Sequence, residues 1–300
     1  MTNTAPHDVL CVGEALIDLV PDGGLYAPRA GGAPANVAAA AAGLGRRSAL
    51  ISAVGADWLG DTVLGALRDA RVDCTYVSRD PHRATGVAVV APAGVQPGFL
   101  LYRSASADAH LTLTADARRA VETSRVVHIS SLLAASEAGE RVQQSVLGAV
   151  DRDRTLVSYD VNIRTAAWPA PEAMLTATRE MLRRADIIKV TEEELRILGV
   201  TLTSAVAADA LWLVTDGAAA ARLVTSRFDV RVPIEAVTVV DTTGAGDATL
   251  AALLDGVLAA PSPRRIGRDD AERALRRAVS IGSYVVTQHG AMCDLRPFTA

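Results

Sequence analysis

The segment Asp-Thr-Thr-Gly-Ala-Gly-Asp at residues 241–247 most constrains this chain, because it joins a glycine turn to the expected start of a helix. The β-branched run at 237–240 precedes it and predicts a buried strand. Leucine and valine recur at helical spacing over 250–258 and predict one buried helix face. A strand, a bare glycine turn and a helix N-terminus together collect unpaired N–H donors and the positive end of a helix dipole.

Asp247 lies in this turn, and its residue type has two interpretations. Aspartate commonly caps a helix, and an isolated Gly-x-Gly-Asp favours that role. A carboxylate beside an anion-binding turn is also suited to act as a base next to a phosphate. In that case the amides of Gly244, Ala245 and Gly246 form an anion hole, and Asp247 takes the proton of an attacking hydroxyl.

Short apolar runs alternate with helical patterns along most of the chain. We expect strands at 9–12, 49–53, 126–130, 156–160, 187–190, 211–214 and 237–240, and helices at 35–44, 58–70, 136–150, 172–184, 191–198, 246–259 and 269–284. Near-continuous apolar strands separated by helices predict an α/β fold with a largely parallel sheet that is buried on both faces. Ligands of such folds bind beyond the carboxyl ends of the strands.

Two segments, 14–31 and 84–104, break the alternation, because they show extended runs and turns without a helix between them. Residues 88–90 and 99–102 are expected to pair as a hairpin through the turn at 94–98. No linker or repeat divides the remaining sequence. We therefore expect one domain over residues 1–300 with a small β extension.

The composition excludes several classes of protein. The formal net charge is −4, with 30 basic and 34 acidic residues, which argues against a general nucleic-acid or membrane-surface binder. The three cysteines have neither disulfide nor zinc spacing, so a reducing cytoplasm is expected. No apolar run reaches the roughly 18 residues of a membrane span, and no signal peptide is evident. Lys189 is the only lysine, so no glycine-rich loop ends as a Walker P-loop does.

Two motifs carry a family resemblance. The string Asp-Thr-Thr-Gly-Ala-Gly-Asp-Ala at 241–248 and the string Gly-Gly-Ala-Pro-Ala-Asn-Val-Ala at 31–38 resemble the two signatures of ribokinase-like carbohydrate kinases. Further matches lie at 12–18, 54–60, 160–164 and 285–291, so the resemblance extends from about residue 9 to residue 297. The matches are most similar to those of fructokinases and 2-keto-3-deoxygluconate kinases.

The resemblance implies a three-layer α/β sandwich with a β lid formed by 14–31 and 84–104. The lid would cover the sugar and make a homodimer contact. The activity implied is transfer of the γ-phosphate of ATP to a sugar hydroxyl, with Mg²⁺ as cofactor and K⁺ as a second cation. Asp247 would be the general base, and the 244–247 turn would be the anion hole.

Several residues offer the chemistry of a sugar site. Gly31 and Gly32 give a turn without side chains, and Asn36 offers both donors and an acceptor to sugar hydroxyls. Asp18, an acid within an apolar run, is implied to bind two neighbouring hydroxyls; its alternative is an edge-strand residue that faces water. Arg103 in the lid and Arg164 after a strand are both expected to face the substrate. Two such arginines would favour an acidic sugar, which keeps 2-keto-3-deoxygluconate as an alternative to fructose.

The resemblance also implies nucleotide and cation sites. The residues assigned to the nucleotide are Asn162, Lys189, Thr215, Gly217, Gly244 and Gly246. Glu194 is implied to reach Mg²⁺ through water, although acids that open a helix also complement its dipole. The residues assigned to a K⁺ site are Asp241, Thr243, Val285, Gln288, Gly290 and Asp294.

Three rival functions remain open at this stage. A nucleoside kinase or an acidic-sugar kinase would use the same chemistry. A dinucleotide-binding oxidoreductase is disfavoured, because Gly13 begins Gly-Glu-Ala and not Gly-x-Gly-x-x-Gly. A sugar-binding sensor without turnover is disfavoured by the intact Gly-Ala-Gly-Asp string.

Overall fold

The computed structural model describes residues 6–91, 99–202, 209–217 and 219–299. Its main sheet has nine strands in the order β13-β12-β11-β10-β9-β8-β1-β4-β5. These strands are β1 (Val9–Val12), β4 (Ser48–Gly55), β5 (Val77–Asp80), β8 (Val126–Ser130), β9 (Leu156–Asp160), β10 (Ile187–Thr191), β11 (Leu211–Asp216), β12 (Ala220–Val224) and β13 (Asp229–Pro233). The strands from β11 through β10, β9, β8, β1 and β4 to β5 run parallel. Strand β12 pairs antiparallel with β11, and β13 pairs antiparallel with β12. The predicted largely parallel sheet is confirmed.

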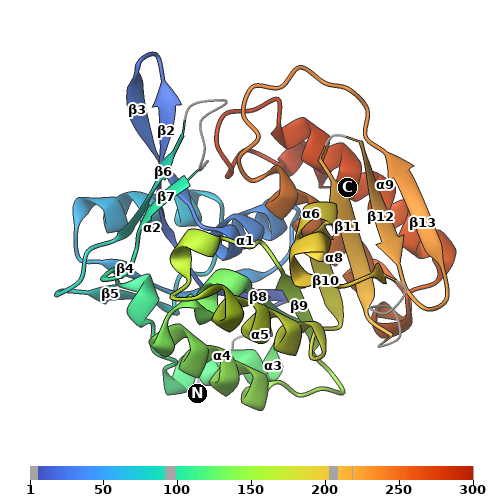
Figure 1. The fold of residues 1–300 in the computed structure, drawn as a ribbon, viewed down its shortest axis with the longest axis horizontal. Helices are drawn as coiled ribbons and strands as arrows, with labels where there is room; N and C mark the ends of the chain where they lie inside the picture. Colours follow the sequence, from blue (N-terminus) through green and yellow to red (C-terminus); the bar gives the residue numbers. More distant parts are fainter. Residues whose placement is uncertain (1–5, 92–98, 203–208, 218, 300) are drawn as a thin grey trace.

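Helices cover both faces of this sheet and make three layers (Figure 1). One face packs on α1 (Ala33–Gly43), α2 (Trp58–Asp69), α8 (Ala245–Ala259) and α9 (Arg268–Val285). The other packs on α3 (Ala115–Thr123), α4 (Glu137–Ala149), α5 (Pro171–Leu182) and α6 (Glu192–Leu198). Neighbouring residues of one strand, such as Leu10 and Cys11, enter opposite cores because side chains alternate across a strand.

A second sheet, the lid, has four strands in the order β3-β2-β6-β7. They are β2 (Leu16–Asp22), β3 (Leu25–Gly31), β6 (Gly86–Val90) and β7 (Phe99–Tyr102), and they fall inside the two segments that interrupted the alternation. Strands β6 and β7 pair antiparallel, as predicted for a hairpin, but the expected turn at 94–98 lies outside the described residues. The lid projects from the main sheet (Figure 1).

The prediction of a strand at 237–240 is wrong. These residues form no strand, and Val237, Val239 and Val240 are 39%, 59% and 47% exposed. Hydrogen bonds hold only the end of the segment, where the N–H groups of Val240 and Asp241 both donate to the carbonyl oxygen of Val286. A β-branched run forms a strand only when a neighbour supplies a ladder, and β13 already ends the sheet.

The order of the strands creates the site. After β1, the chain adds β4 and β5 on one side of that strand. It then returns to add β8 on the other side of β1, so the order of the strands reverses between β1 and β8. Such a switch point leaves a crevice at the carboxyl ends of the strands. None of the helices in the described ranges combines the length and apolar character needed to cross a membrane.

Candidate active site

The glycine turn opens α8 without a side-chain cap. Gly244 is the N-cap residue with φ +78°, and no side chain from the described ranges caps the helix. The turn requires glycine for two reasons, because φ is in the left-handed region and a Cβ at Gly244 would lie 2.6 Å from the Cα of Ala291. Gly244 and Gly246 line the cavity, whereas Ala245 does not, and its N–H donates to the carbonyl oxygen of Thr242 at 3.4 Å. The positive end of the α8 dipole lies at this turn.

Asp247 does not cap this helix. Its Oδ2 accepts a 2.8 Å hydrogen bond from Nδ2 of Asn36, which lies in α1. Burial raises the pKa of the Asp247 carboxyl above its ordinary value, and the ammonium of Lys189 opposes that rise. This hydrogen bond joins the motif at 31–38 to the motif at 241–248.

Lys189 adds a buried positive charge beside the turn. Its Nζ donates to both carboxylate oxygens of Asp160, at 2.8 and 3.0 Å, and Asp160 is fully buried. The two residues are register partners on the adjacent parallel strands β9 and β10. A Cβ at Gly246 would lie 3.2 Å from this Nζ, so the lysine reaches the glycine turn. Sequence reasoning did not assign Asp160 to the site, because strand register was not visible.

These groups surround a cavity of about 400 Å³ between the main sheet and the lid. Of the residues assigned to the site from sequence, those that line it are Asp18, Gly32, Asn36, Asn162, Arg164, Lys189, Thr243, Gly244, Gly246 and Asp247. Sequence reasoning missed the carboxylate of Glu14 and the apolar wall from the lid, which consists of Leu16, Ala88, Val90, Phe99 and Leu101. The short apolar runs of β6 and β7 were the available signal for this wall.

Asp18 lies inside the cavity and not on a water-facing edge. It is 7% exposed, and its pKa is raised to about 7 by burial and by repulsion from Asp247, against the attraction of Arg164. On β3, Gly31 lies opposite Leu16, two residues before Asp18, and a Cβ at Gly31 would clash with Oδ2 of Asp18. Glycine at that position therefore leaves room for the carboxylate.

The two arginines assigned to the substrate have different surroundings. Arg164 lines the cavity, with its guanidinium 4.9 Å from the ring centroid of Phe99 in the lid. Arg103 is 6% exposed and forms an ion pair with buried Asp108, while its Nη1 donates to the carbonyl oxygen of Leu132 at 3.2 Å. The structure therefore brings Arg164 to the cavity but holds Arg103 behind its wall.

Asn162 and Glu194 lie close together at the ends of β9 and β10. Asn162 lines the cavity with φ +33°. Glu194 forms a capping box with Thr191, and its Oε1 accepts a 2.7 Å hydrogen bond from the N–H of Ile163. Each oxygen of Glu194 thus already accepts from the protein. Such a carboxylate suits Mg²⁺ held through water better than direct coordination.

The described residues around Asp241 form a tight loop. Its Oδ1 accepts from the N–H of Thr243 at 2.8 Å, and its Oδ2 accepts from the N–H of Gly290 at 3.0 Å. The N–H of Gln288 donates to the carbonyl oxygen of Val285 at 2.9 Å. Within the described ranges, no group of three or more His, Cys, Asp or Glu side chains is arranged to hold a metal. A K⁺ ion here would rely on backbone oxygens.

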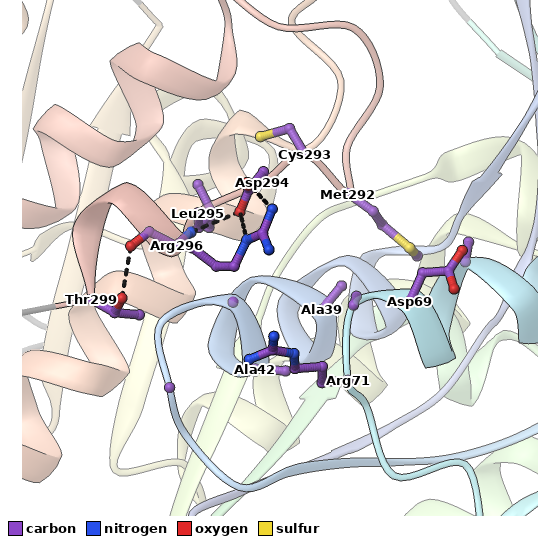
Figure 2. A pocket seen from close by; sticks show the side chains of 14 residues that line it. Ala39, Ala42, Asp69, Arg71, Met292, Cys293, Asp294, Leu295, Arg296 and Thr299 are labelled. Atoms are coloured by element: carbon purple, nitrogen blue, oxygen red, sulfur yellow. Dashed lines mark hydrogen bonds and ion pairs between the residues drawn. The ribbon is translucent and has the colours of Figure 1, made fainter.

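Asp294 lies apart from that loop. It forms an ion pair with Arg296 at 2.6 Å and lines a different hollow of about 550 Å³, which Figure 2 shows against Ala39, Ala42 and Arg71. Its side chain points toward Arg296 in that view. The arginine satisfies this carboxylate, so Asp294 does not join the cation ligands expected from sequence.

Thr215 and Gly217 lie at the end of β11 and in the turn after it, and neither lines the 400 Å³ cavity. A separate hollow of about 550 Å³ lies between β13 and α9. Val279, Tyr284 and Phe298 give it an apolar lining, with Arg276 and Glu235 at its polar side. This hollow is near the exposed 237–240 segment, which contributes Val237 to its wall.

Comparison with known proteins agrees with this site. Residues 6–296 match the model of the pfkB family of carbohydrate kinases. The chain is 32% identical over 311 residues to probable fructokinase-5 of Arabidopsis thaliana, covering 95% of this chain and 93% of the relative. It is 30% identical, with a TM-score of 0.86, to a fructokinase double mutant of Vibrio cholerae O395 bound to fructose, ADP and potassium ion, covering 98% and 96% of the two chains.

A fructokinase of Xylella fastidiosa with bound ATP is 26% identical, with a TM-score of 0.87 and 97% of each chain covered. The fold is therefore the ribokinase-like one expected from the two motifs, and the enzyme class is an ATP-dependent carbohydrate kinase. The chain belongs to the pfkB family of carbohydrate kinases.

Proposed function

We propose that this enzyme transfers the γ-phosphate of ATP to a hydroxyl of a small neutral ketose such as fructose. The observation that carries the proposal is the position of Asp247, which faces the cavity from an uncapped glycine turn beside Lys189. Phosphoryl transfer needs positioning, neutralisation of charge on the phosphate and a base for the attacking hydroxyl. These three parts adjoin one another here.

Each part has a defined role in the proposed step. Asp247 accepts the proton of the sugar hydroxyl as that hydroxyl attacks phosphorus. The N–H groups of Gly244 and Gly246 receive the oxygens of the transferring phosphate, and Lys189 adds positive charge beside them. The apolar wall of the lid keeps water out, so that water does not become the acceptor.

The residues around the cavity include only one of the two arginines assigned to the substrate, which favours a neutral sugar. Glu14, Asp18 and Asp247 are three carboxylates that line it, whereas Arg164 and the Asp160-bound Lys189 are its two cations. The case for an acidic sugar rested on two substrate-facing arginines, and Arg103 is held by Asp108. One of the two arginines on which the case for an acidic sugar rested is therefore absent from the cavity.

The nucleotide is proposed to extend from the glycine turn to the hollow between β13 and α9. An adenine ring suits the apolar surfaces of Val279, Tyr284 and Phe298. When bound with the nucleotide, Mg²⁺ supplies charge neutralisation on the phosphates; Asn162 and Glu194 are the residues that would hold its water shell. Asp241, Thr243 and Gly290 are the residues that would surround K⁺.

A homodimer through the lid is also proposed. The lid face opposite the cavity exposes three large apolar side chains, namely Tyr26, Leu100 and Tyr102. An exposed apolar sheet face usually marks a contact. Light scattering after size exclusion is expected to give a dimer mass for the protein and a monomer mass for Leu100→Asp combined with Tyr102→Asp. A monomeric wild type would refute this contact.

The function is tested by coupled measurement of ADP release over a panel of substrates. Fructose and related ketoses are expected to give the highest kcat/KM, and 2-keto-3-deoxygluconate and nucleosides much lower values. Preference for 2-keto-3-deoxygluconate or for a nucleoside would overturn the substrate assignment. Sugar binding by calorimetry without ADP release from any substrate would instead identify a sensor.

A further inference from the structure

Glu14 is a buried carboxylate that the proposed mechanism does not use. It follows β1, is 2% exposed and lines the cavity. An acid this buried normally needs partners, because desolvation of a charge is costly. The partners of Glu14 show which part of the site it serves.

The first partner is the start of α1. Oε1 of Glu14 accepts a 3.1 Å hydrogen bond from the N–H of Ala33, the first residue of that helix. The N-cap residue of α1 is Gly32, no side chain of the described residues serves as its own cap, and the first turn has no acid. Glu14 therefore supplies from another segment the acceptor oxygen that a helix N-terminus favours.

Three further interactions fix Glu14 itself. Its Oε2 accepts a 3.2 Å hydrogen bond from Oγ of Ser130 at the end of β8. Its backbone carbonyl packs against the turn, since a Cβ at Gly32 would lie 2.5 Å from that oxygen. The guanidinium of Arg103, anchored by Asp108, attracts its carboxylate from behind the cavity wall. Glu14 thus joins β1, β8 and the start of α1.

The helix that Glu14 holds carries Asn36. The N–H of Asn36 donates to the carbonyl oxygen of Gly32, so Asn36 belongs to the same first turn. Its Nδ2 donates to Asp247, and its Oδ1 is buried with no protein partner among the described residues. A shift of the first turn of α1 would therefore move both the bond to the proposed base and an open acceptor for a sugar hydroxyl.

We infer that Glu14 is a positioning residue, which caps α1 from outside the helix and thereby sets the orientation of Asn36 and Asp247. The inference rests on the proposed function of Asp247. Glu14 acts through the reach of its side chain and not through a charge on the substrate. Glutamine keeps that reach and an acceptor oxygen, whereas aspartate keeps the charge but is one methylene shorter.

The test compares Glu14→Gln, Glu14→Asp and Glu14→Ala by kcat and sugar KM. We expect kcat to fall in the order wild type, Gln, Asp, Ala, with a loss of about 10²-fold in Ala from misplacement of the reacting groups. The matched control is Thr114→Ala, which removes the cap that binds the N–H of Ala117 in α3, on the opposite face of the sheet. This control should lose stability and keep its turnover.

A double-mutant cycle separates positioning from general destabilisation. Glu14→Ala is expected to cost much less kcat in the Asn36→Ala background than in wild type, because residues that act in series are not additive. Additive effects would overturn the inference. So would a kcat for Glu14→Asp above that of Glu14→Gln, and this comparison remains decisive if Glu14→Ala does not fold.

A second readout does not depend on activity. Hydrogen exchange at residues 33–36 is expected to accelerate in Glu14→Asp and to stay near wild type in Glu14→Gln, with exchange in α8 unchanged. Unchanged exchange at 33–36 in Glu14→Asp would refute the capping role. Failure of the proposed function would appear differently, as a wild-type protein that releases no ADP with any sugar.

Discussion

Asn36 and Asp247, 211 positions apart in the sequence, are joined by a 2.8 Å hydrogen bond between Nδ2 and Oδ2. The bond links the first turn of α1 to the first turn of α8, and those helices pack side by side on one face of the main sheet. It holds the partly buried carboxylate by one oxygen. Because of this bond, the two sequence motifs form one site.

Asp247→Asn should remove the proposed base while keeping the shape of the side chain. We expect kcat to fall by about 10²–10⁴, which is the usual contribution of a general base. The melting temperature should be unchanged or higher, since burial already disfavours the charged form of this carboxyl. ADP release and thermal unfolding are the two measurements, and turnover near wild type would remove Asp247 from the mechanism.

Replacing each of the two turn glycines with alanine should separate effects on stability from effects on catalysis. Gly244→Ala places a Cβ 2.6 Å from the Cα of Ala291 at positive φ, so it should destabilise the protein by at least about 1–2 kcal/mol. Gly246→Ala meets only the flexible end of Lys189, at 3.2 Å, and should leave the melting temperature nearly unchanged. It should nevertheless lower kcat, because the methyl group displaces Lys189 from the turn. A larger loss of stability in Gly246→Ala than in Gly244→Ala would contradict these contacts.

Lys189→Met should leave Asp160 charged, buried and unpaired. Breaking a buried ion pair from one side typically costs about 3–5 kcal/mol, so a large drop in melting temperature is expected. Adding Asp160→Asn should recover much of that loss, since the unpaired charge is then removed. Turnover should stay low in both variants, because neither has a cation at Gly246. Recovery of kcat in the double variant would show that Lys189 is only structural.

Asp18 should make the stability of the protein depend on pH. Its pKa rises from 3.8 to about 7 in the fold, so between those values the folded state keeps a proton that the unfolded state has lost. Stability from this group is therefore full below pH 4 and is lost as pH rises through about 7. The loss is on the order of 4 kcal/mol at most.

Asp18→Asn is the variant that tests this dependence. The fall in free energy of unfolding from pH 5 to pH 8, measured with urea, should be smaller in this variant than in wild type. A residual fall is expected, because burial also raises the pKa of Glu14, to about 7. Equal pH dependence in the two proteins would show that Asp18 is ionised normally in the fold.

Local sequence patterns were sufficient for most of the main sheet and for the helix after the glycine turn. Continuous apolar runs indicated that β1, β4 and β8 are buried on both faces, and their side chains enter both cores. The helix after the turn, α8, was predicted to bury one face, but every residue from 248 to 258 except Gly256 is buried. The same patterns failed at 237–240, where β-branched residues have no strand beside them. They also gave no signal for α3 or for the pairing of β12 with β13.

The sequence by itself determined the chemical parts of the site, because the conformational freedom of glycine, the carboxyl group of aspartate and the amino group of the single lysine belong to the residue types. Only the tertiary structure decided how those parts are paired. It placed Asp160 opposite Lys189 through strand register, turned Arg103 toward Asp108 and brought Glu14 to the start of α1. The pairs Asp160–Lys189 and Glu14–Ala33 join residues 29 and 19 positions apart, and local propensity contains no term for such contacts.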